Sequence, residues 1–412
     1  MFDALLRFAN FRIFFITRAL SLIGEFAQRL AAGWLAYELT DSGLILGITV
    51  VSRQIAIGVL SPVAGVWIDR LNRRKVIFVT QSLFMLQAFA LAIATYTGHI
   101  SVEGLIALEL FAGIVSGLDM PLRHTFLYDL ITDKRYLTNG IALQSSMFNT
   151  CKIIGPAFAG FMIPFIGEAG CFFFNGVTFV FCLAGLWMMK LPPIVSEGPS
   201  KVKFLGEFVE GLRYAWQTPR LRASLLLASG MAFFCFSYGL YLPIYTGDYL
   251  NKGTEILGLL TTGIAAGAIL GALLLARHRN KHTLINWVIA GCVLYGVSNF
   301  LFASWVNFFF AMVCMLLLGL CEVWVFATTK TIVQSTADPA FTGRISSIYV
   351  ALFMIPFTLG AFLKGWMIDQ FGLMPTLVIN GIGCLGVLGV YVIVNRSEFY
   401  YLRNEKKLRR TG

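Results

Sequence analysis

The chain has 412 residues, of which 58% are hydrophobic and 13% charged, and its formal net charge is +11. Soluble domains carry roughly 25% charged residues, so this composition excludes an ordinary soluble domain. Apolar runs of about 20 residues recur along the whole chain, and a helix of that length spans the hydrocarbon core of a bilayer. We therefore predict an all-α polytopic membrane protein.

Breaks between the apolar runs predict twelve membrane-spanning helices. No cleavable signal peptide is expected before them, because "MFDALLRFANFR" leads directly into a first span that is too long for the apolar region of a signal peptide. The predicted spans are 11–38, 44–68, 76–96, 102–122, 139–166, 169–190, 222–247, 255–276, 283–304, 307–330, 344–368 and 373–395.

The cysteines all fall within predicted spans and lack the spacing of metal ligands. We expect them to be small core residues that neither form disulfides nor bind metal. They are Cys151, Cys171, Cys182, Cys235, Cys292, Cys314, Cys321 and Cys384.

Lys and Arg are distributed unequally between the predicted loops. If both termini lie on one side, most of the 32 Lys and Arg residues lie there too, and the loops of the opposite side hold only Lys252. Such asymmetry places both termini in the cytoplasm. It also accounts for the net charge without a nucleic-acid partner. The basic tail "RNEKKLRR" is a candidate contact with anionic membrane lipids.

The longest polar interruption, residues 191–221, divides the chain into two sets of six spans. We expect an N-terminal bundle at 1–190, a cytoplasmic linker at 191–221, a C-terminal bundle at 222–395 and a basic tail at 396–412. Within the linker, five apolar residues at helical spacing predict an amphipathic helix on the membrane surface. They are Leu205, Phe208, Val209, Leu212 and Trp216.

Short repeated sequences support this division. "GFMIPFIG" (160–167) ends the fifth predicted span and "GWMIDQFG" (365–372) ends the eleventh, and "GVWID" (65–69) at the end of the second is close to "GWMID". Weak repeats of this kind are typical of transporters built from duplicated units.

The segment "GVWIDRLNRRKV" (65–76) resembles the loop 2–3 signature of the major facilitator superfamily, G-x-x-x-D-R-x-x-R-R, at Gly65, Asp69, Arg70, Arg73 and Arg74. Longer stretches, among them "SGLDMPLRHTFLYDLI" and "TGRISSIYVALFMIPFTLGAFLKGWMIDQFG", are similar to the bacterial branch that holds enterobactin exporters and related multidrug permeases. The resemblance implies two pseudo-symmetric six-helix bundles and secondary transport of a small molecule by a monomer in the bacterial inner membrane.

The resemblance also implies a gate. The Asp of this loop helps to latch the cytoplasmic side shut, so Asp69 is expected near the start of span eleven, where a helix N-terminus favours a carboxylate. Arg123 is the expected ionic partner and Asp129 belongs to the same network, with Gly65, Arg70 and Arg74 in the signature itself. The alternative is that the cations of this loop serve membrane topology alone.

Ionisable residues inside predicted spans are costly and therefore suggest function. Arg18, Glu25 and Arg29 fall within about 40° on one face of the first span, and Glu25 and Arg29 have the i,i+4 spacing of a pair. Further ionisable residues in spans are Arg53, Glu109, Lys152, Glu322 and Lys364.

Two interpretations of these residues stay open. Glu25 with Arg29 or Arg53, and Glu109 with Lys152, could be permanent pairs that stabilise the bundle. Alternatively, the excess of cations in the first half binds an anionic substrate, since the resemblance implies that spans one, four, seven and ten line a central cavity. Neutral residues are usual in the family where Glu25 and Arg29 stand, which disfavours a general hydrophobic-drug pump. The candidate substrate-binding residues are Arg18, Glu25, Arg29, Arg53, Lys152, Tyr238, Tyr241 and Glu322.

Span seven contributes the two tyrosines of that set. Phe234, Tyr238, Tyr241 and Tyr245 share helical spacing and predict one aromatic stripe. We expect Tyr245 to belong to the aromatic belt at the membrane interface, and Tyr238 and Tyr241, one turn deeper, to stack on a ligand.

Coupling to protons requires a group that changes protonation. All four histidines lie in loops or at span ends, which leaves Glu25 and Glu109 as the candidates. Burial and neighbouring cations shift the pKa of a carboxyl group in opposite directions, so its protonation can respond to a change in its surroundings. "IIGPAFAG" (153–160) resembles the Gly-Pro element of span five in family exporters. Its Gly155, Pro156 and Gly160 are expected to allow close helix approach.

The sequence contains no Walker A motif and no catalytic signature of a metalloprotease or hydrolase. We expect neither an enzyme nor a cofactor. The favoured hypothesis is a proton-coupled exporter of a small anionic metabolite such as a siderophore. The alternatives are uptake of such a metabolite or of a lysophospholipid, general multidrug efflux, and a membrane sensor or scaffold without transport.

Overall fold

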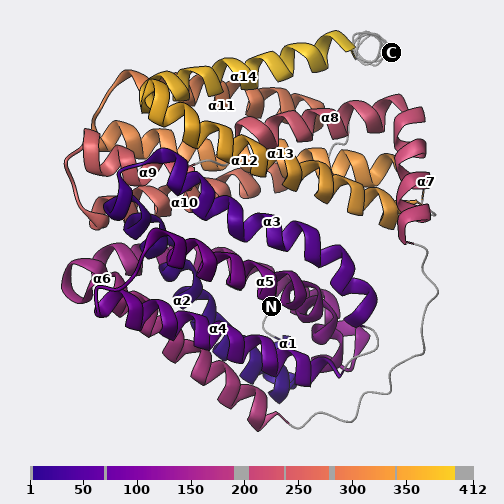
Figure 1. The fold of residues 1–412 in the computed structure, drawn as a ribbon. Coiled ribbons are helices and arrows are strands. Elements are labelled where there is room, and N and C mark those ends of the chain that lie inside the picture. Colours follow the sequence, from indigo (N-terminus) through magenta and orange to yellow (C-terminus); the bar gives the residue numbers. More distant parts are fainter. Residues whose placement is uncertain are drawn as a thin grey trace. The chain divides into compact units, whose positions relative to one another are not determined.

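The computed structural model describes residues 3–68, 72–189, 204–235, 238–277, 284–338 and 341–394. Every regular element within these ranges is helical (Figure 1), which confirms the all-α prediction. The elements in chain order are α1 (Asp3–Arg7), α2 (Ala9–Thr40), α3 (Gly43–Ile68), α4 (Arg73–Tyr96), α5 (Val102–Leu130), η1 (Lys134–Tyr136), α6 (Leu137–Met188), α7 (Phe204–Gln217), α8 (Pro219–Phe234), α9 (Tyr238–Ile244), η2 (Tyr245–Tyr249), α10 (Thr254–Ala276), α11 (Leu284–Ser304), α12 (Phe308–Thr336), α13 (Thr342–Phe371) and α14 (Leu373–Val394).

The lengths and hydropathy of these helices make the protein a multi-pass membrane protein. Ten stretches in the described ranges are long and apolar enough to cross a bilayer. One of them, α6, is 52 residues long and breaks at Gly167, whose φ of 65° interrupts the helix, so it supplies two spans. The helix α2 is not among the ten, since it carries Arg18, Glu25 and Arg29. With α2 and both arms of α6, the described helices accommodate the twelve predicted spans.

The chain folds into two compact units. Unit 1 holds residues 1–201 together with 238–265 and 362–369, and unit 2 holds 202–237, 266–361 and 370–412. Two short segments from the second half of the sequence therefore group with the first half. The bundle limits expected from the sequence, 1–190 and 222–395, stay a prediction.

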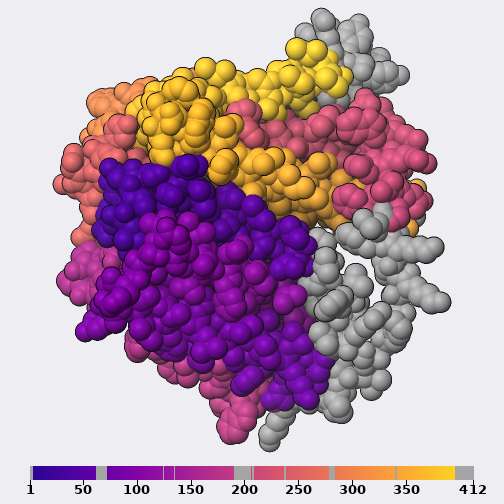
Figure 2. All heavy atoms as spheres, viewed as in Figure 1, coloured from indigo at the N-terminus to yellow at the C-terminus, as the bar shows by residue number. Residues whose placement is uncertain are grey.

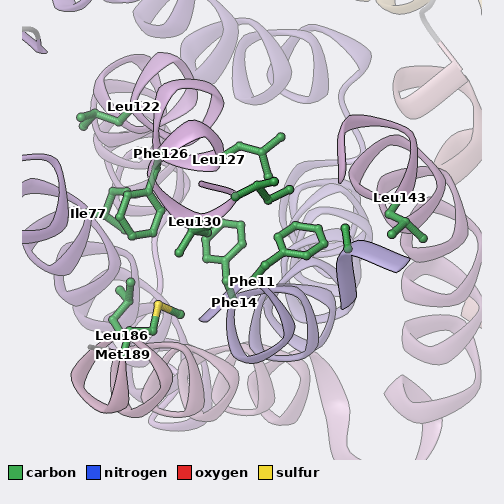
Figure 3. Packing of buried hydrophobic residues seen from close by; sticks show 12 residues of the cluster. Phe11, Phe14, Ile77, Leu122, Phe126, Leu127, Leu130, Leu143, Leu186 and Met189 are labelled. Carbon is green, nitrogen blue, oxygen red and sulfur yellow. The ribbon is translucent and has the colours of Figure 1, made fainter. Parts of the chain in front are cut away.

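In unit 1, α2 packs along α6, α3 along α5, and α4 against both α5 and α6. One apolar cluster gathers Phe11 and Phe14 of α2 with Ile77 of α4, Phe126 of α5 and Leu186 of α6 (Figure 3). The rings of Phe14 and Phe126 meet edge to face with centroids 5.7 Å apart, the geometry that aromatic quadrupoles favour. In Figure 2, the side chains of this unit (indigo to magenta) cover its helices on the face that is drawn.

In unit 2, α11 packs against α12 and α14, and α8 packs against both of these helices. The amphipathic helix expected in the linker is present as α7, which runs crosswise to α8 (Figure 1). Its Ala215 is buried with Leu221, Ile345 and Ile348, and Arg344 of α13 binds Glu210 at 2.8 Å. The helix α7 is therefore anchored to the start of α13.

Among the five residues predicted to form the apolar face of α7, the side chain of Leu205 lies outside the described part of the chain. Val209, Leu212 and Trp216 are exposed, as a membrane-surface helix requires. Phe208, which was predicted to share their face, instead packs on the cluster around Ala215. The apolar stripe is wide enough for α7 to contact protein on one side and remain exposed on the other.

Candidate functional site

Glu25 in the middle of α2 is the centre of an ion-pair network. Its Oε1 accepts from Nη2 of Arg29 at 2.6 Å and from Nη2 of Arg53 at 3.0 Å, and its Oε2 accepts from Nη2 of Arg18 at 3.3 Å. The shared face of Arg18, Glu25 and Arg29 predicted from α2 is thus confirmed, as is the i,i+4 pair. Arg53, on α3, joins from the neighbouring helix.

The network continues from α3 to α5. Nη1 of Arg53 lies 3.3 Å from Oε2 of Glu109, so one guanidinium bridges two carboxylates. The close packing of these helices depends on Gly113, where an added Cβ would lie 2.5 Å from the backbone oxygen of Arg53. One interpretation of the sequence paired Glu109 with Lys152, whereas in the structure Glu109 binds Arg53.

Burial makes this network electrostatically unusual. Arg53 is 6% exposed and Glu109 4% exposed, and isolated charges at such positions are strongly disfavoured. Three arginines face two glutamates, which leaves one excess positive charge among these five residues. The buried Nε of Arg53 and Oε1 of Glu109 have no hydrogen-bond partner in the part of the chain that the structure describes. Arg29 is the most accessible member, with 41% of its side chain exposed.

The remaining candidate substrate residues lie on other helices. Lys152 is half-buried on α6 in unit 1, and Glu322 is half-buried on α12 in unit 2. Their expected role in binding stays a prediction.

The residues of the aromatic stripe predicted in span seven fall on two helices and η2. The helix α8 ends at Phe234, Cys235 is extended, and α9 begins at Tyr238. Tyr241 is 5% exposed, and Tyr245 is fully buried and stacks on Tyr249 with ring centroids 6.1 Å apart. The expected placement of Tyr245 in a lipid-facing belt is therefore wrong, because protein covers its ring.

The gate residues are only partly described. Gly65 lies in α3, while Asp69 and Arg70 fall outside the described residues, so a contact of Asp69 with span eleven stays a prediction. Arg74 donates from Nη2 to the backbone oxygens of Leu186 at 2.7 Å and Trp187 at 3.1 Å. It thereby satisfies carbonyl groups that the end of α6 leaves unpaired.

Arg123 and Asp129 each form an ion pair within the described part of the chain. Arg123 pairs with Asp119, one turn earlier on α5, and Nη1 of Arg73 binds Oδ1 of Asp129 at 3.0 Å. Asp69 lies outside the described residues, so the expected network of Arg123 and Asp129 with Asp69 stays a prediction.

Asp119 was missed as a candidate. It is 2% exposed and accepts hydrogen bonds from Oγ1 of Thr80 at 2.6 Å and from Nε2 of Gln81 at 2.9 Å, in addition to its pair with Arg123. The i,i+4 spacing of Asp119 and Arg123 in "DMPLR" could have revealed it.

A second buried polar network was also missed. Gln28 of α2 donates to Oε1 of Gln87 on α4 at 3.0 Å and accepts from Nδ2 of Asn175 on α6 at 2.7 Å. Amides with both oxygen and nitrogen satisfied are well tolerated in the interior. These three residues lie on three different helices, so no short stretch of sequence indicates that their side chains meet.

The small residues of "IIGPAFAG" permit close helix contacts, as predicted. A Cβ on Gly155 would lie 2.5 Å from Cβ of Phe26, and one on Gly160 would lie 2.6 Å from the backbone oxygen of Thr254. The backbone oxygen of Pro156 approaches Gly258 of α10 in the same way. The prediction that this element indicates an exporter and not an importer stays a prediction.

The cysteines and other possible metal ligands are spread across the described residues. No group of three or more His, Cys, Asp or Glu residues within the described ranges could hold a metal ion. All eight cysteines are free and buried, in agreement with their predicted role as core residues.

Comparisons with known proteins agree with this architecture. The chain is 26% identical to the staphyloferrin A transporter of Staphylococcus aureus, over 94% of the chain and 96% of that protein. It is 23% identical to the enterobactin exporter of Shigella boydii (94% and 93%) and 23% identical to the multidrug efflux pump Tap of Mycolicibacterium fortuitum (87% and 90%).

Solved structures show the same fold. A bacterial homologue of the human lysosomal transporter Spinster, inward-facing and occupied, matches with a TM-score of 0.76 over 94% of this chain and 96% of that one, at 12% identity. The nucleoside transporter NupG matches with a TM-score of 0.74 over 93% and 98%, also at 12% identity. Residues 3–406 match the family described as Transmembrane secretion effector. The chain therefore belongs to this family of the major facilitator superfamily, whose members move small organic molecules across membranes.

Proposed function

We propose that the protein is a proton-coupled exporter of a small anionic organic molecule, with a siderophore as the favoured substrate class. The observation that carries the proposal is the buried network of Arg18, Arg29 and Arg53 around Glu25 and Glu109. We further propose that it acts as a monomer in the bacterial inner membrane with both termini in the cytoplasm, as the Lys and Arg distribution favours.

Guanidinium groups suit an anionic substrate. Their paired N–H donors match carboxylate oxygens in a bidentate geometry, and they remain charged when buried. In the described structure the carboxylate of Glu25 occupies all three arginines. A substrate carboxylate would compete for the same donors, and the exposed Arg29 would be the first to meet it.

Proton coupling follows from this competition. A substrate that donates a hydrogen bond to the carboxylate of Glu25, while its own anionic group binds the arginines, requires Glu25 to be deprotonated. A proton on Glu25 and a bound substrate therefore exclude each other. Glu109, which shares Arg53 with Glu25, is the second candidate for a proton carrier. Opposite movement of substrate and proton is the physical content of antiport.

The relatives support a transporter of this class and leave one serious competitor. A staphyloferrin A transporter and an enterobactin exporter are both similar over nearly the whole chain. A multidrug pump and a macrolide efflux protein are similar as well. Broad drug efflux would require little charge at the site, whereas this network holds three arginines and two glutamates. The network therefore favours the anionic substrate.

The first test is the iron-chelating activity of culture supernatants from the source organism, with and without the gene, under iron starvation. Loss of activity from the medium with accumulation inside the cell is the expected result. Unchanged secretion would contradict siderophore export as the function. Flux measurements in reconstituted vesicles would then distinguish uptake of the metabolite, uptake of a lysophospholipid, and a protein that transports neither.

A further inference from the structure

The side chain of Asp369, near the end of α13, is bound at the start of α3. Its Oδ1 accepts from the backbone N–H of Gly43 at 2.6 Å, and its Oδ2 accepts from the backbone N–H of Leu44 at 3.2 Å and from Oγ of Ser42 at 2.7 Å. All of these residues belong to unit 1. The contact joins positions more than 320 residues apart in the sequence.

The contact matches what a helix N-terminus requires. The first N–H groups of a helix have no partner within the helix, and the helix dipole favours negative charge there. Ser42 satisfies the N–H of Ile45 through its Oγ at 3.3 Å. Asp369 satisfies two of the N–H groups that Ser42 leaves, those of Gly43 and Leu44. A segment of α13 therefore completes the N-terminal cap of α3.

The backbones on both sides are shaped for this contact. A Cβ on Gly43 would lie 2.8 Å from Cβ of Ile368, and a Cβ on Gly365 would lie 2.5 Å from the backbone oxygen of Gly43. Any larger residue at either glycine would separate the two helices and withdraw the carboxylate. Both helices therefore require a glycine where they meet.

The position of Asp369 also matches that of Asp69 in the internal repeat. "GVWID" ends at Asp69 and "GWMID" ends at Asp369. Asp69 follows the end of α3 and is expected at the start of span eleven, which is α13. Asp369 lies near the end of α13 and binds the start of α3. With Asp69 at its expected position, each of these two helices would supply one carboxylate to the N-terminus of the other.

We propose that Asp369 is the latch of the outer gate, the counterpart of the expected cytoplasmic latch at Asp69. It holds the outer side shut while the protein opens to the cytoplasm, and it leaves the start of α3 when the outer side opens. Alternating access requires contacts that form in one state and break in the other. Asp369 is exposed at this edge, so water can replace its partners when the helices part. The proposal rests on the proposed orientation but on no particular substrate.

A neighbouring contact supports an interface at this end of the unit. The hydroxyl of Tyr37, one turn before the end of α2, donates to Asp248 of η2. Residues 238–265, like 362–369, come from the second half of the sequence and group with the first half. The carboxyl ends of α2 and α13 therefore both take part in contacts between the two halves of the sequence.

The test measures access from outside, in the full chain and without substrate. Thr246 in η2 is fully buried, and Thr246→Cys introduces a small reporter thiol near Asp248. Its rate of reaction with a membrane-impermeant maleimide is measured in right-side-out membrane vesicles, after subtraction of the reaction of the eight native thiols. Asp369→Asn is expected to raise the rate about twofold to fivefold, because a carboxylate at an exposed helix N-terminus contributes that factor to the closed state. Asp369→Ala, which also removes the acceptors, is expected to raise it further.

Asp41→Asn is the matched control. Asp41 precedes Ser42, is exposed and carries the same charge, and its side chain has no hydrogen bond among the residues that the structure describes. Its φ of 50° is one that Asn tolerates. Labelling in this variant is expected to equal that of the parent. Equal labelling in Asp369→Asn and the parent, or an equal rise in Asp41→Asn, would overturn the latch.

Folding is checked by the thermal unfolding temperature of each variant in detergent. If Asp369→Asn does not fold, Ser42→Ala removes only the hydroxyl donor and is expected to raise labelling by a smaller factor, and no rise in that variant would also contradict the proposal. Siderophore export can fail without altering these rates, and the latch can fail without altering export, so the two proposals are judged separately.

Discussion

Among individual residues, the central feature is a single carboxylate that contacts three arginines. Glu25 contacts Arg18, Arg29 and Arg53, and 16% of its side chain is exposed. Removing one partner of a buried ion pair leaves an uncompensated charge. A group in this position has a large effect on its neighbours when its charge changes, which is what coupling of a proton to an anion requires.

The first prediction concerns Glu25→Gln. Transport driven by a pH gradient is expected to be lost in reconstituted vesicles, while substrate exchange at equal pH remains, because Gln keeps the shape of Glu but cannot carry the proton. Glu38→Gln on the same helix is the control, since Glu38 binds Nε1 of Trp34 at 2.6 Å and lies outside the network. Equal loss of both modes in Glu25→Gln would assign Glu25 to folding or substrate binding.

A second prediction concerns the buried pair that was missed in the sequence. Asp119→Leu leaves Arg123 buried without its carboxylate, and we expect a loss of about 3–5 kcal/mol in the free energy of unfolding. The double variant Asp119→Leu with Arg123→Leu is expected to lose less than the sum of the single variants. Thermal unfolding in detergent, followed by a thiol-reactive fluorophore, measures both. Additive losses would show that the pair is not coupled.

Among the helices, glycines decide how closely neighbouring elements approach. The helices α3 and α5 touch at Gly113 and Gly117, α2 and α6 at Gly155, and α6 and α10 at Gly160 and Gly258. Without hydrophobic attraction between helices inside lipid, such contacts are the main source of packing energy. The same contacts set the positions of the ionisable groups, since Arg53 and Glu109 lie on either side of the interface between α3 and α5.

The third prediction tests this link between packing and the site. Gly113→Ala is expected to cost about 1–3 kcal/mol of stability, because the new Cβ would lie 2.5 Å from the backbone oxygen of Arg53 and overpacking carries a cost of that size. It should also weaken transport by moving Arg53 away from Glu109. Gly33→Ala in α2 is the control, because nothing lies within 4 Å of its added Cβ, and it is expected to be neutral or slightly stabilising. A stable and fully active Gly113→Ala variant would contradict the argument.

For the molecule as a whole, the two repeated aspartates are expected to act in opposite directions. Asp369 binds the start of α3, and the resemblance to the superfamily places Asp69 at the start of α13. If each carboxylate holds one side shut, loss of either one shifts the population of states toward opening on its own side.

The fourth prediction follows from this opposition. Asp69→Asn is expected to lower the labelling rate of Thr246→Cys from outside, whereas Asp369→Asn raises it, and the double variant is expected to return toward the parent value. Both single variants should slow the transport cycle with little loss of substrate binding. A change of the same sign in both variants would show that the two residues do not form opposed latches.

Much of the fold could be read from the sequence because a bilayer imposes strong local rules. Long apolar helices are required wherever the chain crosses lipid, so span positions, the all-α class and the buried cysteines followed from composition and apolar patterning. The face shared by Arg18, Glu25 and Arg29 also followed, since helical periodicity sets it. Family membership rested on long matched segments, and the match over residues 3–406 confirmed it.

Contacts between helices could not be read in the same way. The pairing of Glu109 with Arg53, the burial of Tyr245 and the binding of Asp369 to α3 depend on which residues of different helices meet. Lipid gives every helix the same apolar exterior, so the sequence of one span carries little information about its neighbour. Local sequence was therefore sufficient for the helices and for the part of the site that lies on α2 alone. The partners that neutralise each charge became known only from the packed structure, because they depend on the approach of helices that are distant in sequence.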